Sequence, residues 1–355
     1  MNRQTNQQEL PLLSVIVFAY NIEKELLNRC VSSAVRQTYT NLEIILVNNA
    51  STDDTTGLYC DEWEQKDNRI KVIHFKAPVD IDTPVMKATT GEYIHILDHD
   101  DWIAPNMYAK MMSAMLSTNS DIARCEFCFA YPDGRIEHRN ITHETVDFET
   151  VGREESVLLL LENKKWQTYW WQNIFKKSLF DHYVSPTKEE IFGDLATIHT
   201  LFNHALQTVY LHDVFYYYYQ RPGSEVNSLN DQRKMYRDYC RGNAHYERYL
   251  FVKQHTEYHG MLRPLKKTAA LHGIFSLWDM IDNPQCFPDN AYKEQVEKLN
   301  TFSLSLRVGA MLFILNLDLL ILKIFPNGYK PYYKLFRLFY KNLRRLYRYI
   351  KRKHN

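Results

Sequence analysis

Short apolar runs alternate with helix-like segments in the first part of the chain. Three runs rich in β-branched residues predict buried strands at Leu12–Tyr20, Leu42–Val47 and Ile70–Phe75. Apolar residues recur at helical spacing from Leu26 to Ala34, and Thr55–Lys66 is also helix-like. Strands that alternate with helices predict βαβ units and a parallel sheet, so the chain begins with a Rossmann-like half-domain.

A fourth strand follows, and after it the pattern is less regular. Pro105–Thr118 predicts a helix, Asp121–Tyr131 a strand and Ser156–Asn163 a short helix. The predicted fold class is α/β, with a mostly parallel central sheet flanked by helices and a helical appendage at the carboxyl end. The expected divisions are 1–228 for the α/β domain, 229–300 for a helical extension and 301–355 for an apolar helix with a basic tail.

The segment Glu92–Trp102 joins the fourth strand to a cluster of carboxylates. Its first residues are mostly apolar or aromatic, and three aspartates follow them. Open α/β sheets bind their ligands at the carboxyl ends of the strands. Asp98 and Asp100 are spaced so that both can reach one Mg²⁺ or Mn²⁺ ion, which would complete its coordination with water and substrate phosphate. An acidic surface turn without a ligand is the alternative.

Glycine-rich phosphate loops are absent from the sequence. No G-x-G-x-x-G follows the first strand, and there is neither a Walker A loop nor the glycine-rich loop of sugar-phosphate nucleotidyltransferases. A metal on Asp98 and Asp100 is therefore the candidate that would hold phosphates. Cys125 and Cys128 form a C-x-x-C pair, but no second pair follows at zinc-site spacing, so we expect buried thiols.

Charge is unevenly distributed along the chain. The formal net charge is +1, but Lys323–Asn355 holds 11 Lys and Arg and no Asp or Glu, which leaves a balance of −10 for residues 1–322. Apolar and aromatic residues interleave with these cations, a pattern typical of a basic amphipathic helix on an anionic membrane surface. Nucleic-acid binding is the alternative explanation of the charge, and we favour the membrane.

A strongly apolar run, Val308–Phe325, precedes the basic tail. It is 18 residues long, and Asn316, Asp318 and Lys323 interrupt it. A helix that spans a membrane needs about 20 apolar residues, and an Asp near its centre is costly. We expect a re-entrant or interface-lying helix, or a helix buried between subunits of a homo-oligomer. Because Met1–Leu10 lacks the apolar core of a signal peptide, we expect a cytoplasmic protein at the inner face of the cell membrane.

An aromatic cluster lies at Trp166–Phe175. Core packing is the ordinary role of such residues. The alternative is that Trp170 or Trp171 stacks against the apolar face of a sugar ring. The cluster alone does not choose between the two.

The order of these motifs resembles that of the family 2 glycosyltransferases, which have the GT-A fold. Six blocks lie in the family's order within residues 14–228: Ser14–Asn21, Leu27–Thr52, Gly91–Ile103, Trp171–Phe180, Ile191–Phe202 and Tyr216–Ser228. One such block would be weak evidence for a resemblance, but six blocks in the same order are strong evidence. The resemblance implies a nucleotide-sugar donor, with UDP expected, bound by Ala19, Tyr20, Asn21, Asn48, Asn49, Lys87, Asp98, His99, Arg221 and Ser224.

The resemblance also assigns parts of the reaction. Asp98 and Asp100 would hold Mg²⁺ or Mn²⁺, and Trp170 and Trp171 would lie on the acceptor side. Asp194 matches the block that carries the catalytic base, with a helix N-cap as its structural alternative. A base on the face opposite the leaving group implies inversion at the anomeric carbon.

Arg221 and Ser224 lie in a segment that also contains a proline and a glycine, residues that permit a loop to close over a ligand. We hypothesise that this loop folds over the diphosphate and that Arg221 pairs with a phosphate. A surface loop without a catalytic role is the alternative.

Three positions depart from the family's pattern. The second strand ends in Asn48–Asn49, where the family commonly has two aspartates, one of which bonds to N3–H of the base. Asparagine can accept that bond through its side-chain carbonyl. Lys76–Thr90 is short and lacks the family's Arg-Asn helix near the diphosphate, so Lys87 is the candidate cation there. Gly193 replaces the first residue of the family's Glu-Asp pair, which leaves Asp194 alone.

The sequence thus predicts a metal-dependent, inverting glycosyltransferase of the hexosyltransferase type. It would move a sugar to a hydroxyl of a glycan or lipid-linked acceptor in surface-polysaccharide synthesis. A catalytically weak, nucleotide-binding scaffold of a glycan-assembly complex is the alternative, motivated by Asn48–Asn49. A nucleotidyltransferase is a third interpretation, against which the missing glycine-rich loop argues.

Overall fold

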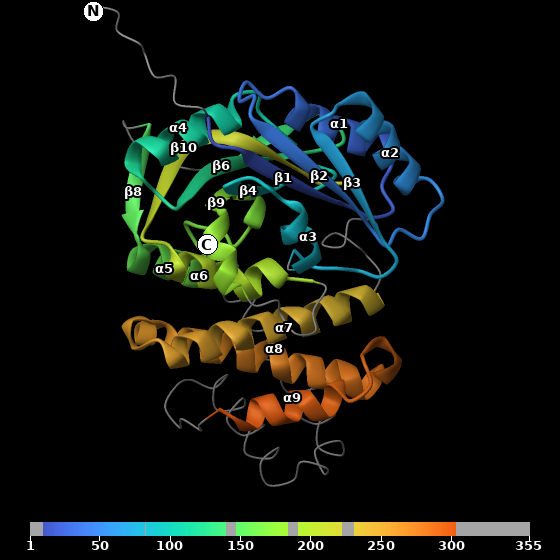
Figure 1. The fold of residues 1–355 in the computed structure, drawn as a ribbon. Coiled ribbons are helices and arrows are strands. Elements are labelled where there is room, and N and C mark those ends of the chain that lie inside the picture. The colour runs from blue at the N-terminus through green and yellow to red at the C-terminus, as the bar shows by residue number, and fades with distance from the viewer. Residues whose placement is uncertain (1–9, 82, 140–146, 184–190, 222–230, 303–355) are drawn as a thin grey trace, which may run out of the picture. The chain divides into compact units, whose positions relative to one another are not determined.

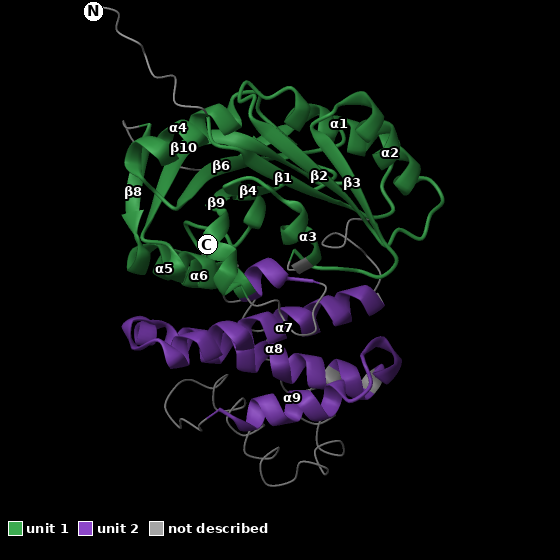
Figure 2. Ribbon diagram, viewed as in Figure 1, with its two compact units in different colours: residues 1–187, 197–227 green, residues 188–196, 228–355 purple. Residues whose placement is uncertain are grey.

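The structure is a computed structural model, and it describes residues 10–81, 83–139, 147–183, 191–221 and 231–302 (Figure 1). The predictions for Ser224, for the apolar run and for the basic tail fall outside these residues. The chain divides into two compact units, one of residues 1–187 and 197–227 and the other of residues 188–196 and 228–355 (Figure 2).

A ten-stranded mixed sheet forms the first unit. Its strands are β1 (Leu13–Ala19), β2 (Leu42–Asn49), β3 (Ile70–Phe75), β4 (Tyr93–Ile96), β5 (Trp102–Ile103), β6 (Ile122–Ala130), β7 (Ile136–His138), β8 (Phe148–Gly152), β9 (Asn173–Lys176) and β10 (Gln207–Tyr219). The main order is β3-β2-β1-β4-β9-β6-β10-β5. Strands β1 to β4 pair in parallel, as do β6 and β10, whereas β9 runs antiparallel between β4 and β6.

Helices cover this sheet, with α1, α2 and α4 on one face (Figure 1). The helices of this part of the chain are α1 (Lys24–Val35), α2 (Thr56–Lys66), α3 (Thr83–Ala88), α4 (Met107–Thr118), α5 (Arg153–Glu162) and α6 (Gly193–His204), with 3-10 turns at Trp170–Gln172 and Lys177–His182. The prediction of an α/β fold with a mostly parallel sheet is confirmed. The short α3 was not predicted, and α5 begins three residues earlier than expected.

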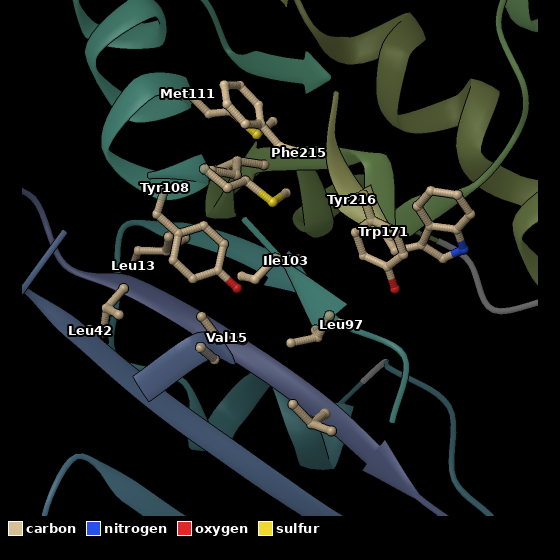
Figure 3. Packing of buried hydrophobic residues seen from close by; sticks show 14 of the residues in the cluster. Leu13, Val15, Leu42, Leu97, Ile103, Tyr108, Met111, Trp171, Phe215 and Tyr216 are labelled. Carbon is tan, nitrogen blue, oxygen red and sulfur yellow. The ribbon is translucent and has the colours of Figure 1, made fainter. Parts of the chain in front are cut away.

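The core lies between the sheet and the helices on this face. Strand β1 is buried along nearly its whole length, with Val15 and Val17 in the same cluster as Leu27 of α1 and Met111 of α4 (Figure 3). Full burial of such aliphatic side chains contributes about 1.5–3 kcal/mol each. The cysteines are free, and Cys125 and Cys128 are buried, as expected.

The second unit is helical. It contains α7 (Asp231–Gln254), α8 (Leu262–Asp282) and α9 (Ala291–Asn300), with α8 packed against both other helices, and 3-10 turns at Thr256–Met261 and Pro284–Cys286. None of the helices in the described residues is long and apolar enough to cross a membrane.

Candidate active site

The carboxyl ends of three neighbouring strands meet at one edge of the sheet. Strand β1 lies between β2 and β4, and all three are parallel, with Ala19 opposite Asn48 and Ile16 opposite Ile96. The residues that follow these strands therefore come together, as the sequence predicts. They are Tyr20, Asn21, Asn49 and the acidic turn from Asp98 to Asp101.

Asn21 ties the end of β1 to the loop after β2. Its backbone has a φ of 43°, a left-handed conformation that asparagine tolerates better than most residues. Its side-chain amide donates to Thr52 Oγ1 at 2.9 Å, and its carbonyl accepts the backbone N–H of Thr52 at 2.8 Å and of Asp53 at 3.2 Å. Asn21 thus holds together the ends of β1 and β2, where a nucleotide-sugar donor would bind.

The two asparagines at the end of β2 are bonded within the chain. Asn48 Nδ2 donates to Nδ1 of His74 at 3.1 Å. The Asn49 amide bonds twice to Val79, donating to its C=O at 3.1 Å and accepting its N–H at 2.8 Å. An aspartate could accept this N–H but would repel the carbonyl. The pairing therefore explains the departure from the family's aspartate.

Helix α1 holds the backbone of the acidic turn. Arg29 Nη2 donates to the carbonyl oxygen of Asp100 at 2.9 Å, and Cys30 Sγ donates to that of Asp98 at 3.3 Å. The guanidinium carbon of Arg29 lies 4.0 Å from the ring centroid of Trp102. Sequence reasoning missed Arg29, because it stands beside the apolar stripe of α1 and no local motif marks it.

The carboxylate of Asp101 is bonded inside the protein. It is fully buried, and its two oxygens accept the hydroxyl of Tyr216 at 2.8 Å and the backbone N–H of Tyr219 at 2.7 Å. Burial raises the pKa of its carboxyl, and the nearby Asp100 and Asp98 raise it further. These bonds anchor the acidic turn to β10.

Replacing Tyr216 with phenylalanine is expected to lower the free energy of unfolding by about 1–3 kcal/mol, because a buried oxygen of Asp101 loses its donor. The same hydroxyl accepts the N–H of Asp98 at 3.3 Å, so the turn loses two bonds. Urea unfolding measures the change. Tyr217→Phe in the same strand is the matched control, and equal effects of the two variants would contradict the anchoring role.

Asp100 forms an ion pair within the candidate metal site. Its Oδ2 lies 2.9 Å from Nε of Arg221, and the two side chains are 16% and 26% exposed. The carboxylate predicted to hold the metal and the arginine predicted to bind phosphate are thus adjacent. The structure brings together two groups that are 121 positions apart in the sequence.

His99 is partly buried, and the charges of both Asp100 and Arg221 act on its ring. Its Nδ1 is 2.7 Å from the carbonyl oxygen of Phe18, which can only accept, so Nδ1 carries the proton. Burial lowers the pKa of the ring. Its Nε2 is buried and has no hydrogen-bond partner in the described part of the chain.

Two other predicted donor-site residues are exposed. The side chain of Tyr20 is 46% exposed and follows β1 directly. Lys87 lies in the last turn of α3 and is also exposed. Their roles toward the donor stay predictions.

The two tryptophans predicted on the acceptor side are buried. Trp171 belongs to the core cluster and stacks on Tyr216 at a centroid distance of 4.1 Å (Figure 3). Trp170 packs edge-on against Tyr183 at 5.3 Å. Both rings therefore pack as core residues, whereas their contact with an acceptor stays a prediction.

Asp194 lies in the second unit, at the start of α6. Its Oδ1 accepts the N–H of Leu195 at 2.6 Å. Burial raises the pKa of its carboxyl to about 6, against the opposing effects of this bond and of Arg248. Such a carboxylate is ionised at neutral pH and is still basic enough to accept a proton.

The donor groups at the acidic turn suit a hard cation. The described residues contain no group of three or more His, Cys, Asp or Glu side chains that could hold a metal by themselves. Mg²⁺ and Mn²⁺ do not require one, because one or two carboxylates suffice when water and substrate phosphates complete the coordination. Asp98 and Asp100 would be the ligands that the protein supplies to the cation.

Comparisons with known proteins identify similar glycosyltransferases. The chain is 29% identical to Glycosyltransferase GlyG of Streptococcus pneumoniae over 62% of its own length and 74% of that protein's. It is also 29% identical to Putative glycosyltransferase EpsH of Bacillus subtilis, over 52% of its length and 53% of that protein's. The solved structure of Staphylococcus aureus TarS 1–349 in complex with UDP has a TM-score of 0.50 and 16% identity, covering 86% of this chain and 80% of that one.

The class defined by this fold and these relatives is the glycosyltransferases of the GT-A fold, as predicted. Within that class the model of Glycosyl transferase family 2 matches residues 14–184 of the chain. The match covers the acidic turn and the segments that follow β1 and β2. It ends before Asp194 and Arg221.

Proposed function

We propose that the chain is a metal-dependent, inverting hexosyltransferase. It would move a sugar from a nucleotide diphosphate donor, with UDP expected, to a hydroxyl of a glycan or lipid-linked acceptor in surface-polysaccharide synthesis. The observation that carries this proposal is the adjacency of Asp100 and Arg221 at the carboxyl edge of the sheet, 2.9 Å apart. A carboxylate and a guanidinium there give one ligand for a cation and one partner for phosphate.

The chain's own groups have distinct parts in this mechanism. Asp98 and Asp100 would bind Mg²⁺ or Mn²⁺, which supplies Lewis-acid stabilisation of the charge on the leaving diphosphate. Arg221 pairs with Asp100 in the structure, and on donor binding it would exchange that carboxylate for a phosphate oxygen. Tyr20 and His99 Nε2 would contact the donor. Asp194 would accept the proton of the acceptor hydroxyl.

A nucleotide-sugar panel tests the proposal. We expect UDP release from one donor only when Mg²⁺ or Mn²⁺ is present, and the rate of release to rise on addition of the acceptor glycan. Thermal shift with the same donors, with metal and without it, identifies the nucleotide. Release that is unchanged by chelation would contradict the metal requirement.

The scaffold alternative has one observation in its favour. Asn48 and Asn49 each use part of their side-chain amide in bonds within the chain, which leaves fewer donors and acceptors for a base. A scaffold would bind UDP in the thermal-shift panel and release none from any donor. Turnover therefore separates the two functions.

Attachment to the inner face of the membrane stays a prediction, which rests on the basic tail and on the polar segment Met1–Leu10. The acceptor class also stays a prediction, and it rests on the resemblance to the family 2 glycosyltransferases.

A further inference from the structure

A pocket lined by two arginines lies beside the acidic turn. It has a volume of about 260 Å³ and is bounded by α1, the edge strand β5 and β10. Arg29, Arg36, Trp102 and Tyr217 are among its lining residues, and no carboxylate is. The proposed reaction makes no use of it.

Arg29 is held rigidly in this pocket. Its guanidinium carbon is 4.0 Å from the Trp102 ring centroid and 4.3 Å from that of Tyr219. One Nη donates to Asp100 O at 2.9 Å, while Nε is buried and without a partner among the described residues. Rings that hold the guanidinium reduce the entropy that a new hydrogen bond would cost. The group is therefore prepared for an anionic ligand.

The second arginine and the apolar wall define what the pocket can hold. Arg36 follows the last turn of α1 and is exposed, so it can add a second guanidinium to the same anion. Ile103, Ala104 and Pro105 form an apolar side of the cavity. The volume is below the range of about 300–1,000 Å³ typical of drug-sized ligands, so the occupant is small.

We propose that this pocket binds an oxyanion carried on a single sugar ring, as in a hexose phosphate or a hexuronate. The two guanidiniums would hold the phosphate or carboxylate, and the apolar wall would face the C–H side of the ring. This site is separate from the proposed donor site, whose phosphate partner is Arg221. It does not depend on the metal or on the proposed base.

Isothermal titration calorimetry on the full chain in metal-free buffer tests the site. Glucose 1-phosphate, glucuronate and inorganic phosphate are the probes. We expect one of the two sugar anions to bind more tightly than inorganic phosphate, and Arg36→Glu to raise its Kd at least about tenfold, since an attraction becomes a repulsion. Arg36→Lys keeps the charge but loses the planar fork, so we expect an intermediate Kd.

Two matched variants locate the binding. Lys164→Ala removes an exposed cation elsewhere on the first unit, and Arg221→Ala removes the candidate phosphate partner of the donor site. Neither should change the Kd of the sugar anion. The proposal is overturned if Arg36→Glu binds like the parent chain, if Arg221→Ala is the variant that loses binding, or if neither sugar anion binds saturably.

Discussion

Replacing Asp100 with asparagine is expected to lower kcat for sugar transfer by about 10²–10³-fold, the range found when one preorganised electrostatic group is removed. Asparagine keeps the shape of the side chain but loses the charge that would hold Mg²⁺ or Mn²⁺ and that pairs with Arg221 at 2.9 Å. Because charge on the diphosphate develops as the bond breaks, kcat should fall more than the affinity for the donor. Steady-state UDP release measures kcat.

Manganese binding gives a second measurement that does not require turnover. Electron paramagnetic resonance with Mn²⁺ should show a Kd at least about tenfold higher for Asp100→Asn, since one of two carboxylate ligands is lost. Asp133→Asn is the matched control, an identical change at a side chain that is 68% exposed. Wild-type kcat in Asp100→Asn would refute the assignment, and lost turnover with unchanged Mn²⁺ affinity would place the metal on other groups.

The strands and long helices could be predicted because burial leaves local patterns. Strand β1 is buried on both faces, so Leu13–Ala19 reads as a continuous apolar run, and α4 shows its Met-rich face at helical spacing. Helix α3 has only six residues, too few for a helical period to stand out. The acidic turn could be placed at the carboxyl ends of the strands because it directly follows a predicted parallel strand.

The contacts that shape the candidate site were not predictable, because they join residues far apart in the sequence. Asp101 bonds to Tyr216, and nothing in a run of four tyrosines marks the one whose hydroxyl is buried on a carboxylate. From the sequence, Asn49 is a weakened contact to the nucleotide base. The structure shows that its side-chain amide bonds to the backbone of Val79. The aromatic cluster was ambiguous for the same reason, since Trp171 finds its stacking partner on β10.

Replacing Asp194 with asparagine is expected to lower kcat by about 10²–10⁴-fold, the usual contribution of a general base. Asparagine can still accept the N–H of Leu195, which lies 2.6 Å from Asp194 Oδ1, so the start of α6 should be preserved. It cannot accept a proton from the acceptor hydroxyl. Acceptor extension measures the loss, and Mn²⁺ affinity should be unchanged because Asp194 is no metal ligand in this assignment.

The pH profile distinguishes a base from a merely structural residue. Burial raises the pKa of Asp194 to about 6, and only the ionised form can accept a proton. In the parent chain kcat/KM should therefore fall about tenfold per pH unit as the pH drops below about 6, and this limb should vanish in Asp194→Asn. Asp289→Asn, at an exposed carboxylate of the same unit, should keep both the rate and the limb. A residual limb near pH 6 in Asp194→Asn would assign the titrating base to another residue, and a variant with wild-type kcat would leave Asp194 as a helix cap only.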